Sequence, residues 1–192
     1  MEEFEVVIDP TSYADIFLAA DICPVEISGL AKVIKESGRY LIFGEPFIPK
    51  QKCMDNGTET DFDMIAYGKW CDEMIRSGRE VELKQFRLWW HSHARSDVYF
   101  SITDENTITT IGGFYSEWWM HLVVNKRNQA SLRLDIYKPE RQPPKYIETK
   151  IKFSSPTNSA MMKNLMSERK ERMRKIIEEK VEIVSAWRWD DD

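Results

Sequence analysis

The spacing of hydrophobic residues divides the first part of the chain into a strand, a helix and a hairpin. Short runs of β-branched and apolar residues predict strands, and a Ser-Gly pair between two such runs is typical of a hairpin turn. Polar residues just before an apolar, helix-spaced stretch predict a helix cap. The expected elements are a strand over Phe4–Ile8, a helix capped by Thr11 or Ser12 and running to about Asp21, and hairpin strands over Glu26–Ile34 and Tyr40–Ile48.

The middle of the chain continues this alternation of helical and strand periods. Lys50–Thr60 is polar and predicts a loop. Two helices are expected where apolar residues recur at helical spacing and are followed by glycine. Four strands are expected where apolar residues alternate with polar ones or form a continuous run. These elements are helices over Asp61–Gly78 and about Asp104–Ile111, and strands over Val81–Trp90, Trp118–Val124, Ser131–Tyr137 and Tyr146–Phe153. The pattern predicts an α/β fold with a mixed, largely antiparallel sheet.

A long C-terminal helix is predicted over about Asn158–Val184, where an apolar stripe has a period near 3.6 residues. The polar stretch Ser167–Arg172 interrupts this stripe. A helix packed on the domain with a solvated middle is favoured over a protruding arm that dimerises or grips a protein partner. We therefore expect a domain over residues 1–156 and a helical extension over 157–192, with Trp187 and Trp189 in an acidic tail that either docks elsewhere or folds back.

Composition narrows the class of protein. Of 192 residues, 42% are hydrophobic and 31% are charged, as in a folded globular protein. The net charge of −5 argues against a general nucleic-acid binder. No apolar run is long enough to cross a membrane, and the acidic start does not resemble a signal peptide. Three widely spaced cysteines suggest neither a disulfide framework nor a cysteine zinc site, so a reduced cytoplasmic protein is expected.

Two of the three histidines lie close together in a predicted strand. His91 and His93 are separated by one residue, so their side chains project from the same face about 6–7 Å apart at Cα. Asp104 falls in the first turn of the next predicted helix and can reach back toward the strand end. Two histidines and one aspartate form a three-ligand set, which is typical of catalytic zinc with a fourth position left for water.

Each of these residues also has a structural interpretation. Ser101 and Asp104 have the spacing of a helix capping box. His121 is interpreted as a hydrogen-bonded rim residue, and Glu26 taken alone as a solvated carboxylate at the start of a strand. The combination of His-x-His with Ser and Asp at fixed offsets nevertheless favours a metal site.

The pattern His91-Ser-His93, seven residues, Ser101, two residues, Asp104 resembles that of the JAMM (MPN+, or JAB-domain) metalloproteases. The resemblance extends over about Glu3–Tyr137 and includes the aromatic pair before His91 and an upstream glutamate, matched here by Glu26. Ala94 replaces the proline usual after the second histidine, and the small-apolar strand ends in Ala-Lys-Val instead of glycine. The resemblance implies the MPN fold, which is cytidine-deaminase-like.

The resemblance also implies an activity, the zinc-dependent hydrolysis of an amide, most often the isopeptide bond between a ubiquitin-like modifier and lysine. His91, His93 and Asp104 would hold Zn²⁺, Glu26 would act as general base, and Ser101 would donate to the oxyanion. The alternative is a non-catalytic MPN-fold scaffold or binding module, although such relatives typically lack one or more of these residues. In a third possibility, a competent site stays silent until a partner orders Lys50–Thr60 or engages the C-terminal helix.

Overall fold

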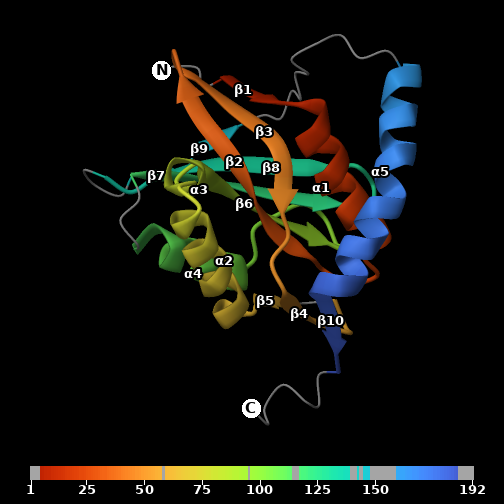
Figure 1. Cartoon of the computed structure of the whole chain (residues 1–192). Coiled ribbons are helices and arrows are strands. Elements are labelled where there is room, and N and C mark those ends of the chain that lie inside the picture. Colours follow the sequence, from red (N-terminus) through yellow and green to blue (C-terminus); the bar gives the residue numbers. More distant parts are fainter. Residues whose placement is uncertain are drawn as a thin grey trace.

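The computed structural model describes residues 5–57, 59–94, 96–113, 117–138, 142, 145–147 and 159–185. Helices are interspersed among the strands along these residues (Figure 1). The helices are α1 (Pro10–Ile22), α2 (Met64–Arg76), α3 (Glu80–Leu83), α4 (Ile102–Gly113) and α5 (Ser159–Lys180). The strands are β1 (Glu5–Ile8), β2 (Ser28–Glu36), β3 (Arg39–Phe47), β4 (Gln51–Met54), β5 (Thr60–Phe62), β6 (Phe86–His93), β7 (Trp118–Asn125), β8 (Ala130–Ile136), β9 (Lys145–Ile147) and β10 (Val181–Val184).

The main sheet has the strand order β1-β3-β2-β6-β7-β8-β9 within the described residues. Its β1–β3 and β6–β7 pairs are parallel, and its other pairs are antiparallel. A second, three-stranded sheet has the order β10-β4-β5, with β10 parallel to β4. The predicted α/β class with a mixed, largely antiparallel sheet is therefore confirmed.

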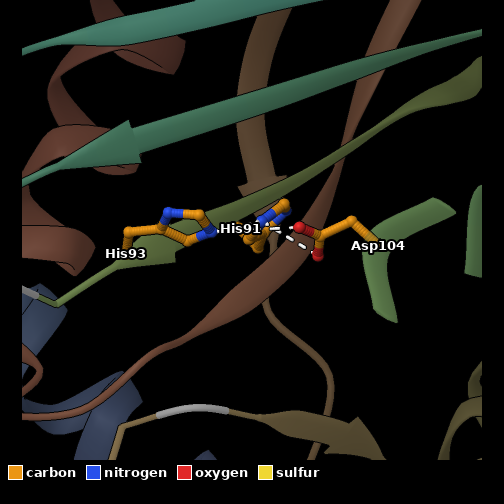
Figure 2. A group of neighbouring side chains, drawn as sticks. All are labelled: His91, His93 and Asp104. Atoms are coloured by element: carbon orange, nitrogen blue, oxygen red, sulfur yellow. Dashed lines mark hydrogen bonds and ion pairs between the residues drawn. The ribbon is translucent and has the colours of Figure 1, made fainter. Parts of the chain in front are cut away.

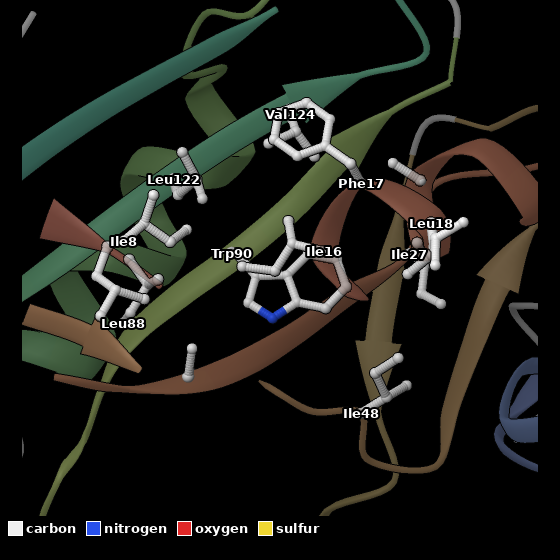
Figure 3. Close-up of a cluster of buried hydrophobic side chains, with 14 of the residues drawn as sticks. Ile8, Ile16, Phe17, Leu18, Ile27, Ile48, Leu88, Trp90, Leu122 and Val124 are labelled. Atoms are coloured by element: carbon white, nitrogen blue, oxygen red, sulfur yellow. The ribbon is translucent and has the colours of Figure 1, made fainter. Parts of the chain in front are cut away.

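The two faces of the main sheet carry separate hydrophobic clusters, because side chains alternate across a strand. On one face, α1 and α5 cover a cluster centred on the fully buried Trp90, with Ile16 and Phe17 from α1 (Figure 3). On the other face, Trp89 packs with Met74 of α2 and Ile108 of α4. The neighbouring residues Trp89 and Trp90 thus anchor β6 to both layers. No helix of the described residues is long and apolar enough to cross a membrane.

The predicted hairpins are confirmed. β2 and β3 pair antiparallel around Ser37 and Gly38, which both have positive φ, at 50° and 80°. Both central residues of a tight type I′ turn adopt this conformation, and glycine takes it without steric cost. β7 and β8 pair across a turn in which Asn128 has a φ of 59°.

The prediction that Thr11 or Ser12 caps the first helix is wrong. Asp9, rather than Thr11 or Ser12, is the N-cap of α1, and its carboxylate accepts the backbone N–H groups of Thr11 and Ser12 at 2.8 and 3.2 Å. The physical reason is Pro10, which fits the first helical position because it has no N–H to leave unpaired. The helix therefore begins before the residues that the pattern suggested.

Three further expectations about elements were wrong. The polar segment Lys50–Thr60 is not a loop throughout, since β4 lies within it and pairs with distant β10. The strand predicted from Val81 begins at Phe86, after the short helix α3. The C-terminal helix ends at Lys180, and Val181–Val184 form a strand. Of the strand predicted over Tyr146–Phe153, only Tyr146 and Ile147 are described, and both lie in β9.

Helix α5 lies along α1, as the packed-helix interpretation predicts (Figure 1). Met173 and Ile177 of α5 are buried in the same cluster as Trp90. In the polar middle of the helix, the Arg169 guanidinium forms two hydrogen bonds, of 2.6 and 2.7 Å, with the buried carboxylate of Asp15 in α1. Trp187 and Trp189 lie outside the described residues, and the domain boundary at residue 157 stays a prediction.

Candidate metal centre

Strand β6 brings His91 and His93 to one place. The two residues end the strand, and both side chains are buried on the face that α4 covers. The His91 ring stacks on that of Trp89, two residues earlier on the same face, with centroids 4.7 Å apart. The ring of Tyr99 packs edge-on against that of His93 at 5.2 Å. These aromatic contacts restrict the orientation of both imidazoles.

Helix α4 supplies the third side chain through its capping box. The carboxylate Oδ2 of Asp104 accepts the Ser101 backbone N–H at 2.6 Å, and the Asp104 N–H donates to Ser101 Oγ at 3.2 Å. This reciprocal pair confirms the capping-box interpretation. It also occupies one carboxylate oxygen, so that Oδ1 is left facing His91. Capping and metal binding are therefore compatible roles for the same pair of residues.

Three donor atoms converge on one point between the strand and the helix (Figure 2). The His91 Nε2 atom lies 3.2 Å from His93 Nε2 and 3.2 Å from Asp104 Oδ1, and His93 Nε2 lies 3.9 Å from Asp104 Oδ2. Ligands about 2.0–2.2 Å from a tetrahedral zinc ion would be separated by roughly 3.3–3.6 Å. The group therefore has the size of a mononuclear metal site, and the His-His-Asp set can bind a metal ion.

The hydrogen bond on the far side of His93 sets its tautomer. Its Nδ1 lies 2.7 Å from the backbone carbonyl oxygen of Asp97, which can only accept, so Nδ1 carries the proton. In the neutral ring, the lone pair of Nε2 then points at the site. Backbone carbonyls commonly orient metal-binding histidines in this way. The Nδ1 atom of His91 is buried and has no hydrogen-bond partner among the described residues.

The electrostatics of the three residues favour an anionic carboxylate beside imidazole rings. Burial opposes ionisation of Asp104, but hydrogen bonds with His91, His93 and Ser101 hold its pKa well below the usual range. Burial lowers the pKa of His91. Burial also acts to lower the pKa of His93, but its contacts with Asp104 and the Asp97 carbonyl, together with the charge of Glu26, raise it overall. If both imidazole rings are neutral, the three ligands carry one negative charge, which offsets one of the two positive charges of a bound dication.

Glu26 lies beside these donors. It lies two residues before β2, whose first residue Ser28 pairs with His91. Next to this pair, the Ser92 backbone N–H donates to the Ile27 carbonyl, and the Ile27 N–H donates to the Ser92 hydroxyl. Burial raises the pKa of Glu26 to about 7; the positive charge of His93 lowers it, and the negative charges of Asp104 and Glu59 raise it. A carboxyl group with this pKa can accept and release a proton near neutrality.

His121 is not the rim residue that its isolated position suggested. It is fully buried in β7, with Nε2 3.4 Å from the Tyr137 hydroxyl and 3.6 Å from Asp135 Oδ2. The reason is the position of β7 in the interior of the sheet, beside β6. The sequence contains no signal for the role of Asp97, because this residue contacts His93 through its backbone carbonyl.

Comparison with known proteins does not identify a family. No family model matches the chain, and no curated protein matches it. Among solved structures, the solution structure of protein DSY2949 from Desulfitobacterium hafniense is similar, with 12% sequence identity and a TM-score of 0.45. The similar region covers 78% of this chain and 95% of that protein. At this level the likeness assigns neither a fold family nor a function.

Proposed function

We propose that this protein is a zinc-dependent peptidase of the JAMM type that cleaves ubiquitin or a ubiquitin-like modifier from lysine. The observation that carries the proposal is the convergence of His91 Nε2, His93 Nε2 and the Asp104 carboxylate, with Glu26 near enough for the charges of His93 and Asp104 to shift its pKa. The mixed sheet flanked by helices and the long helix α5 support the MPN fold as part of this proposal.

The donor set supports zinc over harder cations. Two imidazoles and one carboxylate suit zinc better than calcium or magnesium, which prefer oxygen ligands. The same three residue types also bind non-haem iron.

Glu26 and Ser101 have separate roles in the proposed hydrolysis. When bound, zinc supplies a Lewis acid that activates water and polarises a substrate carbonyl. Glu26 takes the proton of the attacking water at its carboxylate and transfers it to the leaving amine. Ser101 Oγ accepts the Asp104 N–H, so its own hydroxyl proton can be donated to the carbonyl oxygen of the substrate.

The free thiols of Cys23, Cys53 and Cys71 suit a reducing compartment such as the cytoplasm.

Metal content tests the site directly. Purified wild-type protein is expected to contain about one zinc ion per chain by plasma mass spectrometry, and His93→Ala to contain none, because two ligands hold zinc poorly. Asp97→Ala is the matched control, since it removes a neighbouring side chain but keeps the carbonyl that orients His93. A wild-type chain that takes up no zinc from excess metal would contradict the proposal and favour the non-catalytic scaffold.

Turnover tests the assignment of the base. Glu26→Gln is expected to keep its zinc but to lose about 10²–10⁴ in kcat on an isopeptide-linked ubiquitin substrate, because the amide cannot accept the proton. Glu59→Gln is the control, since Glu59 also carries negative charge near Glu26 but takes no part in the proposed reaction. Cleavage by Glu26→Gln at the wild-type rate would exclude Glu26 as the base.

A further inference from the structure

Helix α4, which carries Asp104, is held on the sheet by few apolar contacts. Of its residues from Ile102 to Thr110, only Asp104 and Ile108 are buried, one turn apart on the same face. Ile108 is the fully buried apolar side chain of this stretch, and Ile111, one turn later, is partly buried against the same cluster. A helix with so little buried apolar surface gains little positional restraint from packing alone. The position of Asp104 relative to the histidines must therefore depend on other contacts.

Arg133 of β8 provides a polar contact with this helix. Its side chain is 1% exposed. The guanidinium donates to both oxygens of Asp135, at 2.7 and 2.9 Å, which fixes it to its own strand. It also donates to both carboxylate oxygens of Glu105 in the first turn of α4, at 3.1 Å for the Nη2–Oε2 contact. A bidentate arginine–carboxylate pair restricts both distance and orientation.

The same guanidinium reaches the other end of the capping box. It lies 4.8 Å from the centroid of the Phe100 ring, in the geometry of a cation–π contact. The Phe100 ring in turn packs edge-on against His91. Phe100 and Glu105 are the residues immediately before Ser101 and immediately after Asp104. Arg133 thus holds the capping box from both sides while remaining fixed to the sheet that carries the histidines.

We propose that Arg133 and Glu105 are positioning residues for the metal site, which clamp the Ser101–Asp104 turn at a fixed distance from His91 and His93. The inference rests on the metal site of the proposed function. Neither residue belongs to the ligand set. Their effect passes through the position of Asp104, so removing the clamp should loosen the third ligand while the two histidines stay in place.

Glu105 is the better residue to change, because it is 43% exposed and its loss leaves the buried guanidinium of Arg133 still paired with Asp135. Replacing Arg133 by an apolar residue would leave the buried Asp135 without its partner and endanger folding. Glu105→Ala also introduces the best helix-forming residue, so a loss of metal affinity could not be attributed to poor helix propensity. Glu45→Ala is the matched control, since Glu45 is a half-exposed carboxylate held by two arginines of α5.

The experiment measures zinc affinity by competition with a chromophoric chelator and unfolding of the metal-free chain by urea. Glu105→Ala is expected to raise the zinc Kd about tenfold, the size typical of residues that orient metal ligands. Glu45→Ala is expected to leave the zinc Kd unchanged. It should lower the free energy of unfolding of the metal-free chain by about as much as Glu105→Ala does. The visible absorption of the Co²⁺-substituted protein should shift only in Glu105→Ala. An unchanged Kd in Glu105→Ala, or an equal rise in Glu45→Ala, would overturn the inference.

A second comparison tests Arg133 itself. Arg133→Lys keeps the charge beside Asp135 but cannot make the two-pronged contact with Glu105. It should raise the zinc Kd, and combining it with Glu105→Ala should raise the Kd no further, because both changes open the same clamp. Independent, multiplying effects would contradict the clamp. Wild-type protein that binds no zinc would instead refute the proposed function, so the two failures are distinguishable.

Discussion

The proposed function gives the Ser101 hydroxyl group two roles. Its oxygen accepts the backbone N–H of Asp104 and so caps α4, and its proton would be donated to a substrate oxygen. An alanine substitution removes both functions and cannot separate them. Glycine can, because it is nearly as good at the N-cap position as serine but has no hydroxyl to donate.

Both substitutions at Ser101 are therefore expected to lower kcat, and only one to lower stability appreciably. Ser101→Ala should reduce turnover of an isopeptide substrate by about 10²–10³ and destabilise the chain by about 1 kcal/mol. Ser101→Gly should reduce turnover as much, with a loss of only a few tenths of a kcal/mol. Steady-state kinetics beside urea unfolding would show this. Normal turnover in Ser101→Gly would leave Ser101 as a cap alone.

The donor group could be predicted from sequence because strand and helix periods fix directions locally. One intervening residue places His91 and His93 on the same strand face, and the capping-box spacing places Asp104 in a first helical turn. The convergence with Glu26 depends instead on strand pairing between β2 and β6, which are far apart in the chain. The buried position of His121 depends on the same kind of pairing, and local spacing contains no signal for it.

At the level of elements, the predictions failed where long-range pairing overrides local composition. The segment of β4 is polar, but the side-chain amide of Gln51 is buried and bonds to the backbone of Ser28 at 2.9 Å through both its oxygen and its nitrogen. Strand β10 continues the apolar pattern of α5 and adopts strand structure by pairing with β4. A helix and a strand with the same composition cannot be distinguished without the partner strand.

The contact between α1 and α5 makes α5 part of the main core. Met173 is 3% exposed and packs in the cluster that contains Trp90. Met173→Ala is expected to lower the free energy of unfolding by about 2–5 kcal/mol, because it leaves a cavity in that cluster. Lys175→Ala, at an exposed position on the same helix, should change it by less than about 0.5 kcal/mol. Urea unfolding measures both, and similar values for the two variants would show that α5 contributes little to the fold.

The arginines of α5 make part of the stability dependent on pH. Hydrogen bonds from Arg172 and Arg169 hold the pKa of Glu45 below its ordinary value of 4.5. Because the folded pKa is the lower one, the contribution of this group is present above about pH 4.5 and is lost as pH falls through the folded value. Wild type should therefore be more stable than Glu45→Gln at pH 7, and the difference should close on acidification. A difference that stays constant would contradict the ion pair.

In the whole molecule, the site lies at the junction between strand β6 and helix α4, within a β6–α4–β7 unit whose two strands are parallel. β6 and β7 are parallel neighbours joined through α4, and the two histidines lie at the carboxyl end of β6. In parallel units of this kind, binding sites form at the carboxyl ends of strands, because the following loop and helix start gather there. A metal ion bound between β6 and α4 would therefore tie two layers of the fold together.

Zinc is accordingly expected to stabilise the whole chain. A ligand that binds only the folded state adds about 2.7 kcal/mol at a free concentration of 100 times its Kd. The melting temperature of the wild type should rise with added zinc and fall with a chelator, and His93→Ala should respond to neither. Calorimetric scans would show this, and an equal zinc-induced rise in His93→Ala would place the stabilising ion elsewhere.

The parallel pairing of β10 with β4 has a consequence for the order of folding. Val181 pairs with Gln51, 130 positions earlier in the chain. Contacts between residues so far apart in the chain form late in folding. The chain loses conformational entropy when its distant segments are brought together, and the contacts offset this loss only once they have formed. The small sheet and the packing of α5 on α1 are therefore expected to form after the local hairpins, and the short strands of the small sheet are expected to open first under native conditions. Limited proteolysis should cut within the β4–β5 connection before it attacks the main sheet, and the nascent chain should gain protease resistance there only after residue 184 has left the ribosome.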